Sequence, residues 1–183
     1  NDITNEKTGV RARKGMFLSF QSPEEISGIS VENFLRTAKS AYTGRDMQIL
    51  AFRRELKSKM QDLDMDESYA SRYLNVGFSG GEKKKSEILQ LSVLNPKLAI
   101  LDETDSGLDV DAVKVISKNI LKYKNDSNSL IIITHITRTF KLCKCLMFFN
   151  VFFNRTSRKS QIKNTYVYLP IIGNICVFLF KFV

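Results

Sequence analysis

The chain has 183 residues, a length typical of one domain, with a formal net charge of +9 and three cysteines. The positive charge is concentrated near the C-terminus, because no aspartate or glutamate follows Asp126. A nucleic-acid interface needs basic side chains clustered on one folded face, so this distribution does not predict one. Cys143 and Cys145 lack companion ligands at a zinc-like spacing, so no metal is assigned to them. The absence of cysteine before Cys143 is typical of a reducing compartment.

The first third of the chain predicts a strand, a loop and a group of helices. Residues 1–14 are polar and basic and predict a loop, and residues 16–20 predict a strand that ends before Gln21. Pro23 and Gly28 favour a loop over residues 22–30. Residues 31–60 have a helical pattern interrupted near Gly44, and a short helix is expected over residues 66–74. The expected apolar faces consist of Phe34, Leu35 and Ala38, and of Ile49, Phe52, Leu56 and Met60.

A glycine-rich turn precedes the next expected helix, over residues 82–94. Ser79 is a natural N-cap, and Gly80 and Gly81 let the backbone approach a ligand without interference from a Cβ atom. The free N–H groups at the start of that helix make an anion site. The alternative is a glycine turn that caps a surface helix, in which residues 83–85, all lysine, form a solvated face.

Two acidic residues close an apolar segment over residues 98–101, which is typical of a strand buried on both faces of a parallel sheet. Asp102 and Glu103 follow at the end where parallel strands present ligand-binding groups. A carboxylate there can hold Mg²⁺ beside a nucleotide phosphate. The alternative is a strand that simply ends in polar residues.

A β-α-β unit is expected next. Asp109 can cap a helix over Val110–Tyr123, whose inward residues are Val113, Ile116 and Ile120. A strand over residues 130–134 then returns parallel to the strand at 98–101, and His135, the only histidine, ends it.

In this order and spacing, these motifs resemble the second half of an ABC-type ATPase domain. Residues 75–84 and 102–109 are similar to SufC, the ATPase subunit of the Suf iron–sulfur cluster assembly machinery. Transporter ATPases usually carry glutamine and proline where this chain has Glu82 and Thr104. The resemblance covers roughly residues 8–137. It implies a partial α/β, P-loop NTPase-like domain over residues 1–139, with a parallel sheet core and a helical subdomain.

The resemblance also implies a role for each motif residue, with ATP and Mg²⁺ as cofactors. Glu103 is the expected general base, and His135 is expected to contact the γ-phosphate. Asp102 and Gln21 are the expected metal-binding residues. The expected nucleotide-binding residues are Gln21, Ser79, Gly80, Gly81, Glu82 and Asp109, of which the Ser79 motif contacts the ATP held by the opposing subunit.

The implied partners are a second ATPase subunit, in an ATP-dependent dimer, and a SufB/SufD-type scaffold that docks on residues 20–42. The expected setting is a soluble protein in a reducing compartment, the bacterial cytoplasm or a plastid-type stroma. Two alternatives stay open: the ATP-binding subunit of an ABC transporter, and a non-catalytic remnant that keeps only the docking face.

No phosphate-binding loop of the form Gly-x-x-x-x-Gly-Lys-Ser/Thr occurs in the sequence. The chain is therefore expected to be a fragment of a longer protein and inactive alone. Residues 140–183 lie outside the resemblance and admit three interpretations: a membrane anchor, an interfacial segment or translated non-coding sequence. The loss of the family pattern favours the third. This tail is expected to lower solubility and to add nothing to the fold.

Overall fold

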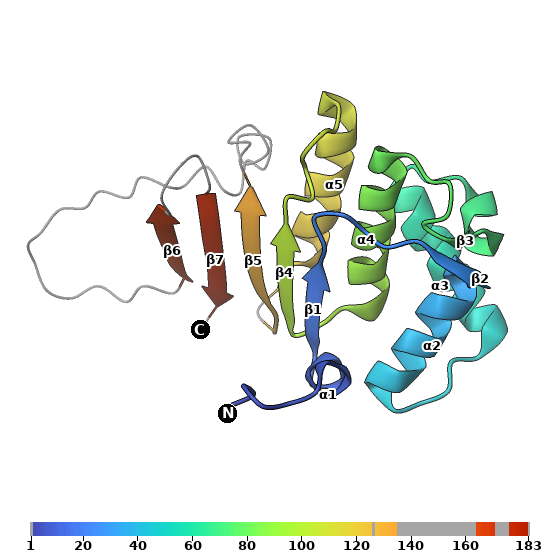
Figure 1. Cartoon of the computed structure of the whole chain (residues 1–183), viewed down its shortest axis with the longest axis horizontal. Coiled ribbons are helices and arrows are strands. Elements are labelled where there is room, and N and C mark those ends of the chain that lie inside the picture. The colour runs from blue at the N-terminus through green and yellow to red at the C-terminus, as the bar shows by residue number, and fades with distance from the viewer. Residues whose placement is uncertain (1, 126, 135–163, 171–175, 183) are drawn as a thin grey trace, which may run out of the picture.

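The computed structural model describes residues 2–125, 127–134, 164–170 and 176–182. Its main sheet has the strand order β1-β4-β5-β7-β6, and a separate two-stranded sheet joins β2 to β3 (Figure 1). Strands β1 (Met16–Ser19), β4 (Leu98–Asp102) and β5 (Ser129–Thr134) run parallel to one another. Because parallel strands end at the same edge of a sheet, the carboxyl ends of β1, β4 and β5 lie at one edge.

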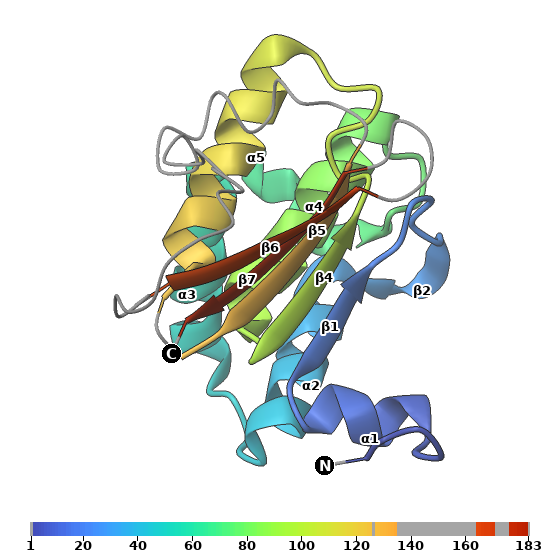
Figure 2. The same cartoon turned by 90° about the vertical axis from the view of Figure 1, so that its left-hand side faces the viewer.

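Helices α4 (Gly80–Leu94) and α5 (Val110–Tyr123) lie on one face of this sheet (Figure 2). The α5 helix connects β4 to β5, which confirms the expected β-α-β unit. Val113, Ile116 and Ile120 are buried, as their spacing indicated. In β4, Ala99 and Leu101 are fully buried, but Leu98 and Ile100 are only half-buried. The expectation of burial on both faces is therefore wrong for this strand.

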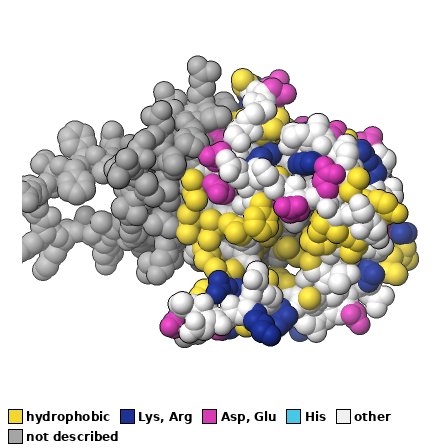
Figure 3. All heavy atoms as spheres, viewed as in Figure 1, with side chains coloured by type: hydrophobic (Ala, Val, Ile, Leu, Met, Phe, Trp, Pro, Cys, Tyr) yellow, Lys and Arg dark blue, Asp and Glu magenta, His cyan; other side chains and the backbone are white. Residues whose placement is uncertain are grey.

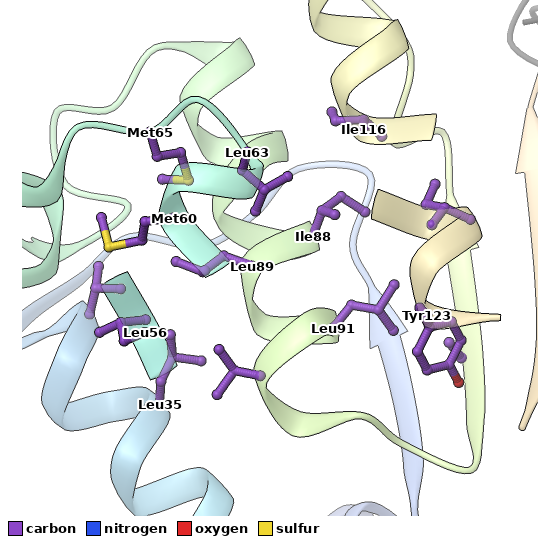
Figure 4. Close-up of a cluster of buried hydrophobic side chains, with 14 of the residues drawn as sticks. Leu35, Leu56, Met60, Leu63, Met65, Ile88, Leu89, Leu91, Ile116 and Tyr123 are labelled. Atoms are coloured by element: carbon purple, nitrogen blue, oxygen red, sulfur yellow. The ribbon is translucent and has the colours of Figure 1, made fainter. Parts of the chain in front are cut away.

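The helices α2 (Val31–Thr43) and α3 (Ile49–Asp62) form a layer beyond α4. They are separated at Gly44, which caps α2 with a left-handed φ of 69°, so the predicted interruption is confirmed. Apolar side chains from these helices meet those of α4 and α5 in one core (Figure 4). Among its fully buried members are Leu35, Leu56, Met60, Leu63, Ile88, Leu89, Leu91 and Ile116. Ile49, expected on the apolar face, is instead 51% exposed at the first residue of α3.

Two predictions for the N-terminal third are wrong. Residues Thr8–Arg13 form the short helix α1 instead of a loop, closed by backbone bonds such as that from Lys14 N to Val10 O. Residues Ile26–Ser30 form β2, which pairs antiparallel with β3 (Tyr73–Leu74). Pairing between β2 and β3 is a long-range contact, which local composition does not reveal.

The expected helix over residues 66–74 is a 3₁₀ helix, η1 (Glu67–Ser71), followed by β3.

The chain near its C-terminus contributes two strands to the main sheet. Strands β6 (Asn164–Pro170) and β7 (Cys176–Phe182) pair antiparallel, and β7 pairs antiparallel with β5. This differs from the expectation that the tail adds nothing to the fold, because β7 satisfies backbone groups along one edge of β5. Within the described segments, no helix is both long enough and apolar enough to cross a membrane.

Candidate functional site

Two of the predicted site residues meet directly at the carboxyl ends of β1 and β4. The side-chain amide of Gln21 donates a hydrogen bond from Nε2 to Oε2 of Glu103, at 3.0 Å. Asp102, the residue before Glu103, is the last residue of β4 and is half-buried. The structure thus brings together residues from segments about eighty positions apart. His135 lies outside the described residues, so its role stays a prediction.

The backbone at Glu103 has an unusual conformation, with a φ of +48°. Its amide donates to the carbonyl of Ile133 in β5 at 2.9 Å, and its own carbonyl accepts from the amide and hydroxyl of Ser106. The next two residues, Thr104 and Asp105, are each only 3% exposed. Glu103 is therefore held by a buried turn and by the neighbouring strand.

The start of α4 is closed by a reciprocal capping arrangement. The Ser79 hydroxyl accepts from the Glu82 amide at 3.3 Å, and Glu82 Oε2 accepts from the Ser79 amide at 2.7 Å. The prediction of Ser79 as N-cap is confirmed. A Cβ atom at Gly80 would meet nothing within 4 Å, whereas one at Gly81 would lie 3.5 Å from Leu108. The backbone at Gly80 is thus open to a ligand.

A cluster of Tyr69, Arg72 and Phe78 packs beside this glycine turn. The Tyr69 hydroxyl donates to Glu82 Oε1, and this bond, followed by the Ser79 amide, lowers the pKa of Glu82. The Arg72 guanidinium lies 4.5 Å from the ring centre of Tyr69 and 4.8 Å from that of Phe78. It also donates to the carbonyl of Gly77 at 3.2 Å. Glu82 is therefore oriented by its own loop, and its contact with a nucleotide stays a prediction.

Asp109 occupies the N-cap of α5, as predicted. Its Oδ1 accepts from the Ala112 amide at 2.7 Å, and the residue is exposed. This capping bond fixes the start of the helix through Oδ1 alone. The predicted role of Asp109 in nucleotide binding stays untested.

A buried lysine on α4 argues against the alternative in which residues 83–85 form a solvated face. Lys84 is only 6% exposed, and its ammonium donates to the backbone carbonyl of Gln21 at 2.8 Å. Burial lowers the pKa of Lys84, whereas the nearby carboxylates, with Glu87 and Glu103 first among them, act in the opposite direction. Lys84 therefore reaches into the site.

Glu87 lies one turn further along α4 and is 4% exposed. Its carboxylate accepts from the Ser19 hydroxyl and from the Phe20 amide, the latter at 3.1 Å. Burial raises the pKa of Glu87, and these hydrogen bonds and Lys84 partly offset that effect. Lys84 and Glu87 are not among the site residues that the sequence motifs predict. Their spacing with Ile88 and Leu91 follows the buried side of a helix and was the available signal.

A cavity lies elsewhere, between α3 and the C-terminal ends of α2, α4 and α5. It has a volume of about 480 Å³ and includes Lys39, Glu55, Asp62 and Lys122 in its lining. These four form two ion pairs, Lys39 with Glu55 and Lys122 with Asp62. The cavity contains none of the predicted site residues. Among the described residues, no group of three or more His, Cys, Asp and Glu side chains is placed to hold a metal.

The combination of fold and motifs agrees with the comparisons. The family model described as "ABC transporter" matches residues 1–106, and the chain belongs to this family. It therefore carries part of an ABC-type ATP-binding domain.

Its similarities to particular proteins support the same conclusion. Vegetative protein 296 of Bacillus subtilis (strain 168) is 48% identical over 139 residues, which cover 75% of this chain and 53% of that protein. The probable ATP-dependent transporter ycf16 of Antithamnion sp. is 48% identical over 141 residues, covering 75% and 56%. The chain thus spans about half the length of the curated relatives it matches.

Solved structures show the same fold. A dimeric post-hydrolysis state of the ATP-binding cassette MJ0796, bound to ADP and Pi, superposes with a TM-score of 0.63 at 18% identity. That match covers 74% of this chain and 58% of the other. An ATP-binding subunit of an ABC transporter gives a TM-score of 0.59 at 26% identity, covering 69% and 51%.

Proposed function

We propose that this chain is part of the ATP-hydrolysing subunit of a Suf-type iron–sulfur cluster assembly complex. The observation that carries the proposal is the hydrogen bond from Gln21 to Glu103, beside Asp102. It unites the residues that a phosphoryl-transfer site needs to bind a metal and to orient water. Glu103 then serves as general base for the attacking water.

The residues present fit a magnesium ion. Mg²⁺ prefers oxygen ligands and is usually bound by one or two carboxylates together with substrate phosphates. Asp102 offers a carboxylate, and Gln21 retains its amide oxygen because Nε2 makes the bond to Glu103. When bound with ATP, the ion neutralises charge on the phosphates. We propose that His135 contacts the γ-phosphate.

The start of α4 is proposed to serve the second pocket of a dimer. Gly80 and Gly81 place backbone N–H groups in the first turn of the helix, and the space beside Gly80 is open, an arrangement that favours anions. Asp109 and Glu82 complete the proposed set. The cassette structures described as dimeric have this fold, so an ATP-dependent dimer is consistent with the comparison.

The choice of Suf over transport rests on a few residues. Glu82 and Thr104 depart from the usual transporter pattern, and both are built into the structure: Glu82 bonds Tyr69, and Thr104 is buried. The second candidate is the ATP-binding subunit of a transporter. It is favoured by the names of several relatives, which are a probable ATP-dependent transporter or a probable ABC transporter ATP-binding protein.

A face beside the site suits a protein partner. Phe20 and Ile26, within the proposed docking segment of residues 20–42, are 56% and 41% exposed, and Tyr73 of the paired strand is 52% exposed. Hydrophobic side chains also gather across the face seen in Figure 3. Exposed apolar side chains that gather in a contiguous patch are typical of protein interfaces. We propose that a SufB/SufD-type scaffold docks here, in the bacterial cytoplasm or a plastid-type stroma.

Co-purification tests this proposal. A form of the protein that includes a phosphate loop is tagged and captured together with candidate partners. We expect a soluble SufB/SufD-type scaffold to be retained and Ile26→Asp to abolish retention. Leu50→Asp, at an apolar residue 70% exposed on α3, is the matched control and should retain the partner. Capture of a membrane permease instead would establish the transporter function, and equal loss in both variants would contradict the docking face.

A further inference from the structure

One turn of α4 holds the segment that leads from β1 into Gln21. Glu87 accepts from the Ser19 hydroxyl and the Phe20 amide, and Lys84 donates to the Gln21 carbonyl at 2.8 Å. Three consecutive residues are therefore bound by two side chains of a single helix. Both side chains are more than nine-tenths buried, so water competes little for these bonds.

We propose that Glu87 is a positioning residue, which sets the place of Gln21 relative to α4, the helix that Ser79 caps. The proposal rests on the function proposed above and deepens it. A carboxylate suits this task because it offers two acceptor oxygens, one for each donor. Loss of the side chain would remove the acceptor of the part-buried Phe20 amide and leave the fully buried Ser19 hydroxyl without this partner.

The consequence concerns communication between the two pockets of a dimer. Gln21 contacts Glu103 within its own subunit, whereas the turn at Ser79 is proposed to serve the opposing subunit. Because α4 carries both Ser79 and Glu87, movement of Gln21 is transmitted along a rigid helix to the turn that faces the other ATP. Glu87 thereby links the metal-binding residue of one pocket to the anion site of the other.

Amide hydrogen exchange on the 183-residue chain tests the positioning directly. In Glu87→Ala, exchange at the Phe20 amide should accelerate about tenfold or more, because its acceptor is gone. Glu87→Gln keeps an oxygen for Phe20 and a donor for Ser19, so its exchange should stay close to the original. Ser86→Ala is the matched control: Ser86 is buried on α4 and its hydroxyl makes no hydrogen bond. If Glu87→Ala fails to fold, Glu87→Leu replaces it. Unchanged exchange at Phe20 would overturn the proposal.

Kinetics then separate positioning from plain structural support. In a form that includes a phosphate loop, Glu87→Ala should lower kcat about tenfold, with KM for ATP changed less than twofold and Glu87→Gln largely restoring the rate. In a Gln21→Ala background, the additional change Glu87→Ala should lower kcat little further, because both substitutions act on one interaction. Rate losses that multiply would contradict positioning through Gln21. If even the unaltered protein lacks hydrolysis, the proposed function fails, and amide exchange still decides the role of Glu87.

Discussion

Two glutamates on one helix show how differently the two ends of the candidate site are built. Glu82, in the first turn of α4, is bound by the Tyr69 hydroxyl and the Ser79 amide, and its pKa is lowered. Glu87, in the next turn, also accepts two hydrogen bonds, yet its pKa is raised. The difference is burial: Glu87 is 4% exposed, and the cost of removing its charge from water outweighs its bonds.

The contrast also separates local from long-range construction. The turn around Ser79 is held by neighbours within about thirteen positions along the chain, so it can form before the sheet is complete. The partners of Glu87 lie 67 and 68 positions away, so this cluster forms only when α4 packs against β1. The first region carries the residues proposed to meet another subunit, whereas the second fixes residues within one.

The largest expected loss of ATP hydrolysis comes from two substitutions, one at Glu103 and one at Ser79. In a form that includes a phosphate loop, Glu103→Gln should reduce ATP hydrolysis by on the order of a hundredfold or more, because the proton acceptor is lost. Ser79→Arg should block closure by placing bulk and charge at the anion site of the opposing pocket. Steady-state ATP hydrolysis by each variant provides the measurement.

Mixing the two variants sharpens this test. If Ser79 acts across the dimer and Glu103 within its own subunit, a mixed dimer places both lesions in one pocket and leaves the other chemically intact. Partial recovery of hydrolysis is the expected result. Activity that merely equals the average of the two pure variants, at every mixing ratio, would refute the shared pocket.

A smaller effect is expected from the backbone at Glu103. A left-handed conformation costs a residue with a side chain on the order of 1–2 kcal/mol, and glycine escapes most of it. Glu103→Gly should therefore be more stable than Glu103→Ala by about 1 kcal/mol, because both lose the carboxylate and only glycine relieves the φ of +48°. Urea denaturation measures the difference. Equal stability of the two variants would show that the turn relaxes without strain.

The smallest effect is a pair of opposite pH dependences. The raised pKa of Glu87 makes its contribution largest below the ordinary glutamate pKa, and that contribution is lost as pH rises through the folded value. The lowered pKa of Glu82 makes its contribution largest above the ordinary value, and that contribution is lost as pH falls through the folded one. Thermal unfolding of Glu87→Gln and Glu82→Gln across acidic pH should show slopes altered in opposite directions. Parallel changes would contradict the comparison.

Local signals in the sequence predicted the parts of the fold that depend on neighbours. The caps at Ser79 and Asp109 and the β-α-β unit through α5 follow from residue types and periodicity, and the structure has them. Strand β2 was missed because it exists through pairing with β3, far along the chain. Helix α1 differs from the predicted loop because its basic composition resembles that of a loop, although several of its residues favour helices.

The site shows the same division. The meeting of Gln21 with Glu103 could be expected from strand ends that share one edge of the sheet. The buried positions of Lys84 and Glu87 could not be expected from composition, because charged residues in a helix usually face solvent. The only signal for burial was their helical spacing with Ile88 and Leu91. The groups that bind their charged side chains lie in and just after β1, far away in sequence.

The left-handed backbone at Glu103 also has a consequence for engineering. Asn75, Asn95 and Asp64 share a positive φ, but asparagine and aspartate tolerate this region far better than glutamate does. A search for stabilising substitutions would therefore choose position 103 early, and glycine would be its natural choice. Such a search would remove the proposed base while improving the fold. At this strained position, selection for stability therefore favours glycine, whereas the proposed catalysis requires glutamate.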